Sequence, residues 1–62
     1  MRRDDVIKVQ PGDKLFHRAL GRVEFTEACD AMMRNFHGDP TSMFVEHDGE
    51  MREVSIHLVE RA

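Results

Sequence analysis

The sequence predicts a mainly β domain with one short helix inserted between its strands. The first observation is the pair Asp48-Gly49, which lies between two β-prone runs, Met43–His47 and Glu50–Ser55. Asp-Gly in this setting is the strongest short-range signal for a hairpin, because a type I′ turn needs positive φ at both central residues. The second observation is a change of hydrophobic period near Thr26, from the alternation of a strand to the roughly 3.6-residue period of a helix.

The N-terminal segment is expected to begin with a frayed, charged end. Residues 1–5 are mostly charged, and residues 6–9 form a short β-prone run, Val-Ile-Lys-Val. Pro11-Gly12 then suits a type II turn, since Pro fixes φ at the first central position and Gly accepts positive φ at the second. With 62 residues, the chain is expected to be a single domain, 1–62, near the lower size limit for one stable core.

Two strands are predicted after this turn. The first covers residues 14–18 and faces inward with either Leu15 or Phe16, while the tip of His17 is expected to reach solvent. The second covers residues 22–25, where apolar and polar residues alternate cleanly, so its apolar side chains are expected to line the core. A glycine supplies the permissive backbone of the tight connection between the two strands.

An amphipathic helix is predicted over residues 27–37. The apolar residues here follow the spacing i, i+3, i+4 and i+7, and they are Ala28, Cys29, Met32, Met33 and Phe36. Thr26 is a suitable N-cap, and Gly38 stands where a glycine commonly ends a helix. Met32 and Met33 cannot both face inward, so one of them is expected to be partly exposed.

The predicted hairpin determines which side chains share a face of the sheet. If the Asp and the Gly are the two loop residues, position 47 faces position 50 and position 43 faces position 54. Directly opposed residues share a face. The face toward the core then carries Met43, Val45 and Val54. Phe44 and Met51 lie on the other face as diagonal neighbours. The chain ends either in one continuous strand or in two short strands separated by a turn at residues 55–57.

Taken in order, the β segments form a series of short motifs. They are Gly12-Asp13-Lys14-Leu15-Phe16-His17, Leu20-Gly21-Arg22-Val23, Phe44-Val45-Glu46-His47-Asp48-Gly49, and Arg52-Glu53-Val54 with Leu58. This series resembles small SH3-like barrels of the Tudor type. Similar patterns occur at the C-terminus of UvrD-type helicases and in the RNA-polymerase-interacting domain of CarD-like regulators and the transcription–repair coupling factor.

The resemblance implies an SH3-like barrel of about five strands with the helix near residues 27–37 inserted. A small non-catalytic binding module is expected, either of transcription or DNA-repair machinery or phage-encoded, with a phage and a chromosomal origin both left open. Two departures from the family pattern stand out. His47 takes a place that is usually aromatic, and the segment from residue 26 to residue 39 is longer than the usual loop.

Composition argues against several classes of protein. The single cysteine, Cys29, cannot form an internal disulfide, so a cytoplasmic location is expected. No apolar run approaches the roughly 18 residues of a membrane span, and the N-terminus lacks the long apolar region of a signal peptide. No Cys-x-x-Cys or His-x-x-x-His pair is present. We therefore expect no membrane association, no metal, no cofactor and no enzymatic activity.

The charge is divided unevenly along the chain. Residues 1–22 hold six basic and three acidic side chains, whereas residues 23–62 hold three basic and nine acidic ones. Such a division is typical either of a surface that meets an anionic partner or of two halves that pair with each other. Lys14, Phe16 and Arg18 have the same strand parity, so two cations flank an aromatic ring on one face.

Three binding functions remain open at this stage. A protein-interaction domain is the leading hypothesis, because five methionines in 62 residues is a high proportion and methionine suits adaptable contact surfaces. A nucleic-acid-binding module that uses the basic first half is the alternative, and a structural subunit that acts as a homo-oligomer is the third. The candidate partner-binding residues are Lys14, Phe16, Arg18, Arg22, Met32, Met33, Phe44 and Met51.

Overall fold

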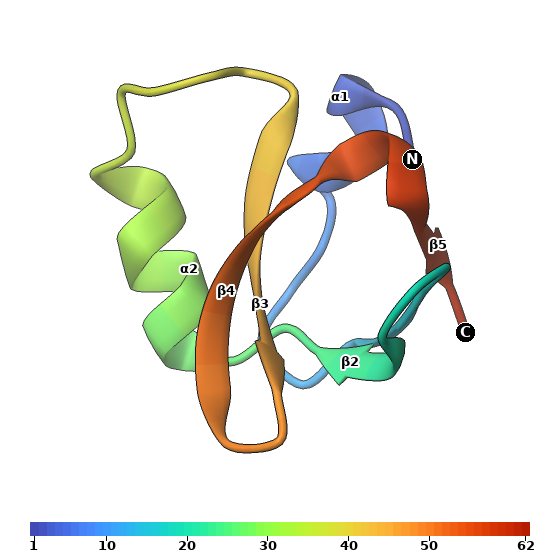
Figure 1. Ribbon diagram of the computed structural model, residues 1–62. Coiled ribbons are helices and arrows are strands. Elements are labelled where there is room, and N and C mark those ends of the chain that lie inside the picture. Colours follow the sequence, from blue (N-terminus) through green and yellow to red (C-terminus); the bar gives the residue numbers. More distant parts are fainter.

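The computed structural model, which describes residues 1–62, is a single five-stranded antiparallel sheet with one helix of two turns and shorter helical segments (Figure 1). The strands are β1 (Lys14–His17), β2 (Gly21–Glu24), β3 (Ser42–His47), β4 (Glu50–Ser55) and β5 (Val59–Arg61). The helical segments are α1 (Arg3–Val6), α2 (Glu27–Arg34) and the 3-10 turn η1 (Ile56–Leu58). The sheet order is β4-β3-β2-β1-β5, so the last strand returns to pair with the first. The predicted fold class, a mainly β domain of five strands with a helix inserted between the second and the third, is confirmed.

The hairpin of β3 and β4 has the predicted register and turn. Asp48 and Gly49 have φ angles of 51° and 79°, the left-handed values that a type I′ turn requires at both positions. Residue 43 faces residue 54, and residue 47 faces residue 50. Met43 and Val45 are fully buried, and Val54 packs against the same core while remaining half-exposed.

Helix α2 begins as predicted. The hydroxyl oxygen of Thr26 accepts a hydrogen bond from the backbone N–H of Cys29 at 3.2 Å, which satisfies one of the free donors at the helix start. Cys29 is fully buried, and Met33 packs partly buried against the core. The neighbouring Met32 is 45% exposed, so the expectation that one of the two methionines faces outward is confirmed.

The predicted end of this helix is wrong. The helix stops at Arg34, with Asn35 as its C-cap, and Gly38 is not among the glycines with positive φ. Asn35 closes the last turn with its side-chain amide, which donates to the carbonyl of Ala31 at 3.1 Å. Phe36 then packs edge-on against Phe44 of β3, with 5.1 Å between ring centroids. This tertiary contact directs the chain toward β3 directly after the helix, before the predicted helix end is reached.

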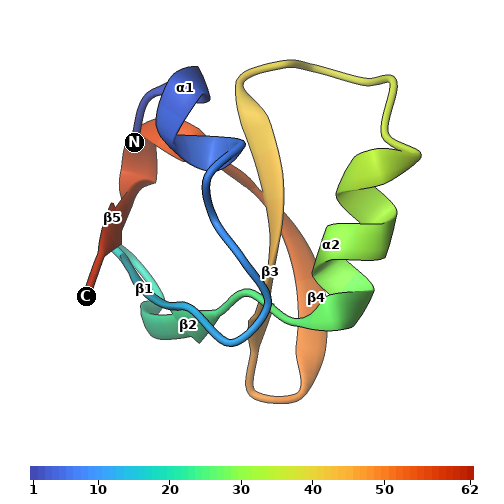
Figure 2. The same cartoon turned by 180° about the vertical axis from the view of Figure 1, so that it is seen from behind.

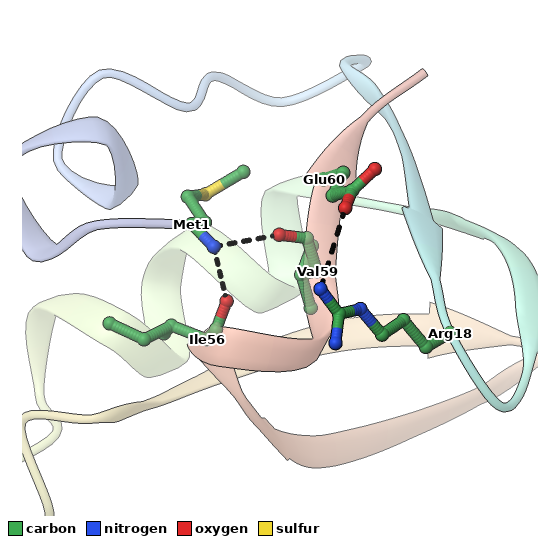
Figure 3. Close-up of polar contacts among 5 residues, drawn as sticks. All are labelled: Met1, Arg18, Ile56, Val59 and Glu60. Atoms are coloured by element: carbon green, nitrogen blue, oxygen red, sulfur yellow. Dashed lines mark hydrogen bonds and ion pairs between the residues drawn. The ribbon is translucent and has the colours of Figure 1, made fainter.

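The N-terminal segment is ordered, and neither a frayed end nor a strand over residues 6–9 is present. The ammonium group of Met1 donates to the backbone carbonyls of Ile56 at 2.7 Å and Val59 at 2.9 Å (Figure 3). Figure 2 shows α1 next to the segment that leads into β5. Two acids in the first turn of α1 favour a helix through the helix dipole. Val9 is then buried in the core without pairing to any strand.

The C-terminal segment follows the second of the two alternatives, two short strands separated by a turn. The side-chain oxygen of Ser55 accepts from the backbone N–H of His57 at 3.3 Å and starts η1. A 3-10 turn advances about three residues per turn, which changes the phase of the alternation. Ile56 and Val59 are therefore buried, whereas Leu58 is 38% exposed instead of continuing the buried row.

The hydrophobic core of the protein is one cluster of nine buried residues. Its buried members are Val9, Leu15, Val23, Phe25, Cys29, Met43, Val45, Ile56 and Val59. They come from every strand except β4, from α2, η1 and the N-terminal segment, and from the residue directly after β2. Because this core takes the inward-facing residues of β1 and β2, the alternate residues of the same strands are left on the opposite surface.

Candidate protein-interaction surface

Strand β1 places the predicted basic residues on its outer side. Leu15 is fully buried and His17 is 5% exposed, so Leu15 rather than Phe16 faces inward. By strand parity, Lys14, Phe16 and Arg18 point away from the core. Arg22 of β2 lies directly opposite Phe16 and completes the group of four predicted residues. The structure thus brings together one half of the predicted partner-binding set.

Phe16 lies in the centre of this surface. Its side chain is 45% exposed, and it is flanked by Arg22 on β2 and by Glu60 on β5, both directly opposite it in the sheet register. We call the residues that share this side of the three strands the outer face. They are Lys14, Phe16, Arg18, Arg22, Glu24 and Glu60. The outer face therefore presents an aromatic ring between a cation and a carboxylate.

Acidic residues are interleaved with the cations of the outer face. Lys14 faces Glu24 across β1 and β2. A guanidinium nitrogen of Arg18 lies 3.9 Å from a carboxylate oxygen of Glu60 (Figure 3). Both side chains of this ion pair are about two-thirds exposed, at 67% and 63%, so water screens it and it contributes little to stability. The charges consequently stay available to a partner, in a pattern of both signs.

A hollow of about 410 Å³ adjoins the outer face. It lies between β2 and the end of β3, two strands that pair only at Glu24 and Glu46. Lys14 and Arg22 line one side, and Asp48 lies on the hairpin side. Glu24 and Glu46 face each other directly, which is unfavourable for like charges. We call this space the β2–β3 hollow; like the outer face, it carries both signs of charge.

His47 forms part of the wall of this hollow. Its side chain is 20% exposed, and its Nδ1 atom is buried without a hydrogen-bond partner. The nearest opposite group is the carboxylate of Asp48, at 3.7 Å, which is beyond hydrogen-bond distance. No hydrogen bond through Nδ1 therefore fixes the orientation of this imidazole.

His17 differs from the prediction that its tip reaches solvent. It is buried, and its Nδ1 atom accepts hydrogen bonds from the backbone N–H groups of Ala19 at 3.0 Å and Leu20 at 3.1 Å. The tight turn between β1 and β2 leaves these donors without strand partners, and the imidazole satisfies them. His17 thereby fixes the turn from which Arg18 and Arg22 project.

The other four predicted residues lie elsewhere. Met33 and Phe44 are partly buried against the core, and Met32 and Met51 are 45% and 37% exposed on α2 and β4. Phe44 is on the outward side of β3 and diagonal to Met51 across the hairpin, as predicted, and its ring packs edge-on against Phe36. These residues belong to the side of the molecule built by α2 and the hairpin, and they do not join the outer face.

Sequence reasoning missed the acidic members of the surface. Glu24 and Glu60 are 36 positions apart in the chain and reach the same face only because β1 pairs with both β2 and β5. The alternation of each strand predicts on which side of the sheet each of these two glutamates lies. It does not predict which strand pairs with β5, because no local signal specifies which earlier strand the chain end joins.

No group of three or more His, Cys, Asp or Glu side chains is placed to hold a metal ion. Cys29 is buried, and its sulfur accepts from the Thr26 hydroxyl at 3.2 Å. The longest helix, α2, has eight residues, and no helix is long and apolar enough to cross a membrane.

No protein-family model matches the chain, and no characterised protein or solved structure shows significant similarity to it. The resemblance to Tudor-type domains remains a prediction.

Proposed function

We propose that this chain is a small non-catalytic module that binds a protein partner through the outer face and the β2–β3 hollow. The observation that carries the proposal is the exposure of Phe16 between Arg22 and Glu60 on a rigid strand. Aromatic residues and arginine are enriched at the centres of protein interfaces, because they combine large contact area with directional polar groups. A half-exposed ring on a central strand suits this use.

The pattern of charge favours a protein over a nucleic acid. A phosphate backbone rewards cations only, and each neutralised phosphate adds to affinity. Here Glu24 faces Lys14, and Glu60 lies beside Arg18. The chain as a whole carries a net charge of −3. A polypeptide, which offers both signs of charge, can pair with such a surface without meeting repulsion.

The resemblance to polymerase-interacting and helicase-associated domains supports a partner in transcription or DNA repair. The shape of the site indicates how that partner would bind. An apolar side chain would cover Phe16, and a neighbouring charged side chain would enter the β2–β3 hollow, where Lys14 and Arg22 stand across from Glu46 and Asp48. A basic side chain there would also relieve the opposition of two carboxylates on β2 and β3.

The test uses two variants of the outer face and one matched control. Phe16→Ser and the double variant Lys14→Glu with Arg22→Glu are compared with Met32→Ser in quantitative capture of proteins from an extract of the native host. Met32 is as exposed as Phe16, at 45%, but lies on α2. We expect the outer-face variants to lose the captured partner while Met32→Ser retains it. Equal capture by all variants would contradict the proposed surface.

A second experiment addresses nucleic acid directly. Duplex and single-stranded oligonucleotides are titrated at two salt concentrations with the parent chain and with the Lys14→Glu, Arg22→Glu variant. We expect binding no tighter than roughly 100 μM at physiological salt, the weak end of nonspecific binding. Micromolar binding that falls steeply with salt and disappears in the double variant would place nucleic acid ahead of protein.

A further inference from the structure

A second surface, unrelated to the outer face, surrounds Ile7. This side chain is 82% exposed, well above the next most exposed large apolar residues, at 45%. Its position is fixed by neighbours on both sides: Val6 packs against the core, and Val9 is 6% exposed within it. Backbone hydrogen bonds from Ile7 to Arg3 and from Val9 to Val6 hold the short helix α1 and the turn after it. Ile7 is therefore held in place while most of its side chain faces solvent.

A hollow of about 240 Å³ lies directly beside this side chain. It opens between α1 and the segment that follows α2, and we call it the α1–α2 hollow. Its apolar lining consists of Val6, Ile7, Met33, Phe36 and Pro40. An apolar cavity of roughly 150 Å³ accommodates a molecule as large as benzene. The α1–α2 hollow therefore has room for one aliphatic side chain, and Ile7 forms part of its wall.

The edge of the same hollow carries one charge of each sign. Arg3 lies on the α1 side, and Asp39 lies on the side of the loop after α2. Neither forms an ion pair within the chain. One oxygen of the Asp39 carboxylate accepts from the backbone N–H of Thr41 at 2.8 Å and from its hydroxyl at 2.7 Å. These bonds orient the carboxylate and leave its second oxygen without a partner.

We propose that the protein forms a two-fold symmetric dimer in which Ile7 of each copy fills the α1–α2 hollow of the other. A two-fold interface uses the same patch on both copies, so it requires a patch that is complementary to itself. This patch has a projecting side chain next to a cavity that fits it. It also has Arg3 next to Asp39, so that each cation meets the carboxylate of the other copy. A patch that binds a different protein need not be complementary to itself. A patch that binds a second copy must be, and this one is complementary to itself both in shape and in charge.

The dimer is expected to be weak. A stable interface usually covers roughly 800 Å² on each partner, and the whole accessible surface of this chain is 4347 Å². A patch around one short helix and one loop is smaller than that, which is typical of transient association. The proposed dimer should accordingly form with a dissociation constant between about 10 μM and about 1 mM.

Sedimentation equilibrium over that concentration range is the first test. For the parent chain, we expect the mass to rise with concentration from 7.2 kDa toward twice that value. Ile7→Ser should remain monomeric throughout. The matched control Leu58→Ser removes another exposed apolar side chain, 38% exposed on η1, and should associate like the parent. Because both side chains are at the surface, neither change should prevent folding.

Charge reversal provides the second test. Arg3→Glu should weaken association at least tenfold, because it places two carboxylates together at each end of the interface. Adding Asp39→Arg to that variant should recover part of the lost association, because the pair is recreated with its signs exchanged while the two hydrogen bonds from Thr41 to the carboxylate are lost. NMR shift changes upon dilution should be confined to residues 3–8 and 36–42.

Three outcomes would overturn the dimer. They are a parent chain that stays monomeric at about 1 mM, an Ile7→Ser variant that associates like the parent, and dilution shifts centred on Phe16 instead of the α1–α2 hollow. Monomeric behaviour of the parent would leave this hollow to a different protein. The capture experiment on the outer face can succeed whichever of these results is obtained, so the two proposals fail separately.

Discussion

Replacing His17 with Leu is expected to lower the free energy of unfolding by about 2 kcal/mol. The imidazole is 5% exposed, and its Nδ1 atom accepts from the backbone N–H groups of Ala19 and Leu20 at 3.0 and 3.1 Å. Leu has no acceptor, so both donors would lose their partner while much of the buried volume is kept. The substitution thus separates hydrogen bonding from packing.

The magnitude follows from the burial of the two donors. An orphaned buried donor costs about 1–3 kcal/mol. Here the turn is at the surface: Ala19 is exposed and Leu20 is half-buried, so water can reach part of each site. We therefore take about 1 kcal/mol for each donor, the lower end of the range. A domain of 62 residues has a total stability of roughly 3–9 kcal/mol, so this loss is a large share of it.

Urea unfolding followed by circular dichroism measures the change. For a small domain, stability falls by about 1 kcal/mol per molar urea, so the midpoint should drop by about 2 M. His17→Asn is the control, because its side-chain oxygen can take the position of Nδ1 as the acceptor. It should recover part of the loss despite its smaller volume. Equal midpoints for parent and His17→Leu, or an Asn variant no more stable than the Leu variant, would refute the role assigned to this histidine.

Three other predictions concern the turn between β3 and β4, the Met1 amine and the Asp39 carboxylate. Gly49→Val should destabilise the protein by more than about 1 kcal/mol, because a β-branched residue is strained at φ of 79°; an unchanged melting temperature would contradict this. Acetylation of the Met1 amine should lower the melting temperature, since an amide keeps one N–H for two carbonyl acceptors and loses the charge. The pKa of Asp39 should lie below its ordinary value, mainly because the Thr41 hydroxyl and then its backbone N–H donate to the carboxylate. The stability contributed by the ionised Asp39 carboxylate is fully present above the pKa of the unfolded chain and is lost as the pH falls through the pKa of the folded protein. An NMR titration of the parent and of the Thr41→Val variant measures this shift.

Much of the local structure was readable from the chain. The Asp48-Gly49 turn, its register and the Thr26 cap all depend on residues within a few positions of each other, so neighbouring side chains and backbone preferences determine them. The turn at Gly12 belongs to the same class: its φ is +96°, and Asp13 donates back to Gln10 at 3.0 Å, as a type II turn requires.

His17 also belongs to this local class, although its role was not predicted. An acceptor side chain two or three residues before the free N–H groups of a turn is the arrangement by which Asn, Asp, Ser and Thr stabilise turns. The signal was therefore present in the order His-Arg-Ala-Leu-Gly. Histidine differs from those residues in that its acceptor is a ring nitrogen, which here takes both N–H groups.

The candidate surface could be predicted only in part. Strand parity placed Lys14, Phe16 and Arg18 on one face, and the register added Arg22. The acidic neighbour Glu60 could not be placed, because it depends on the pairing of β1 with β5. This difference changes the interpretation of the charge: Lys14, Arg18 and Arg22 share one face, but they are mixed there with acids from elsewhere in the chain.

The sequence by itself determined the class of fold, the central hairpin, the start of α2 and the outward parity of the β1 residues, because each of these depends on contacts between near neighbours. Tertiary structure decided the end of α2, which stops where Phe36 turns to meet Phe44. It also ordered the N-terminus, where the Met1 ammonium binds carbonyls more than 50 residues away, at Ile56 and Val59. These features arise from groups that are distant in the chain and meet only after the core has formed. For this reason the local pattern, which predicted a later helix end and a frayed N-terminus, could not specify them.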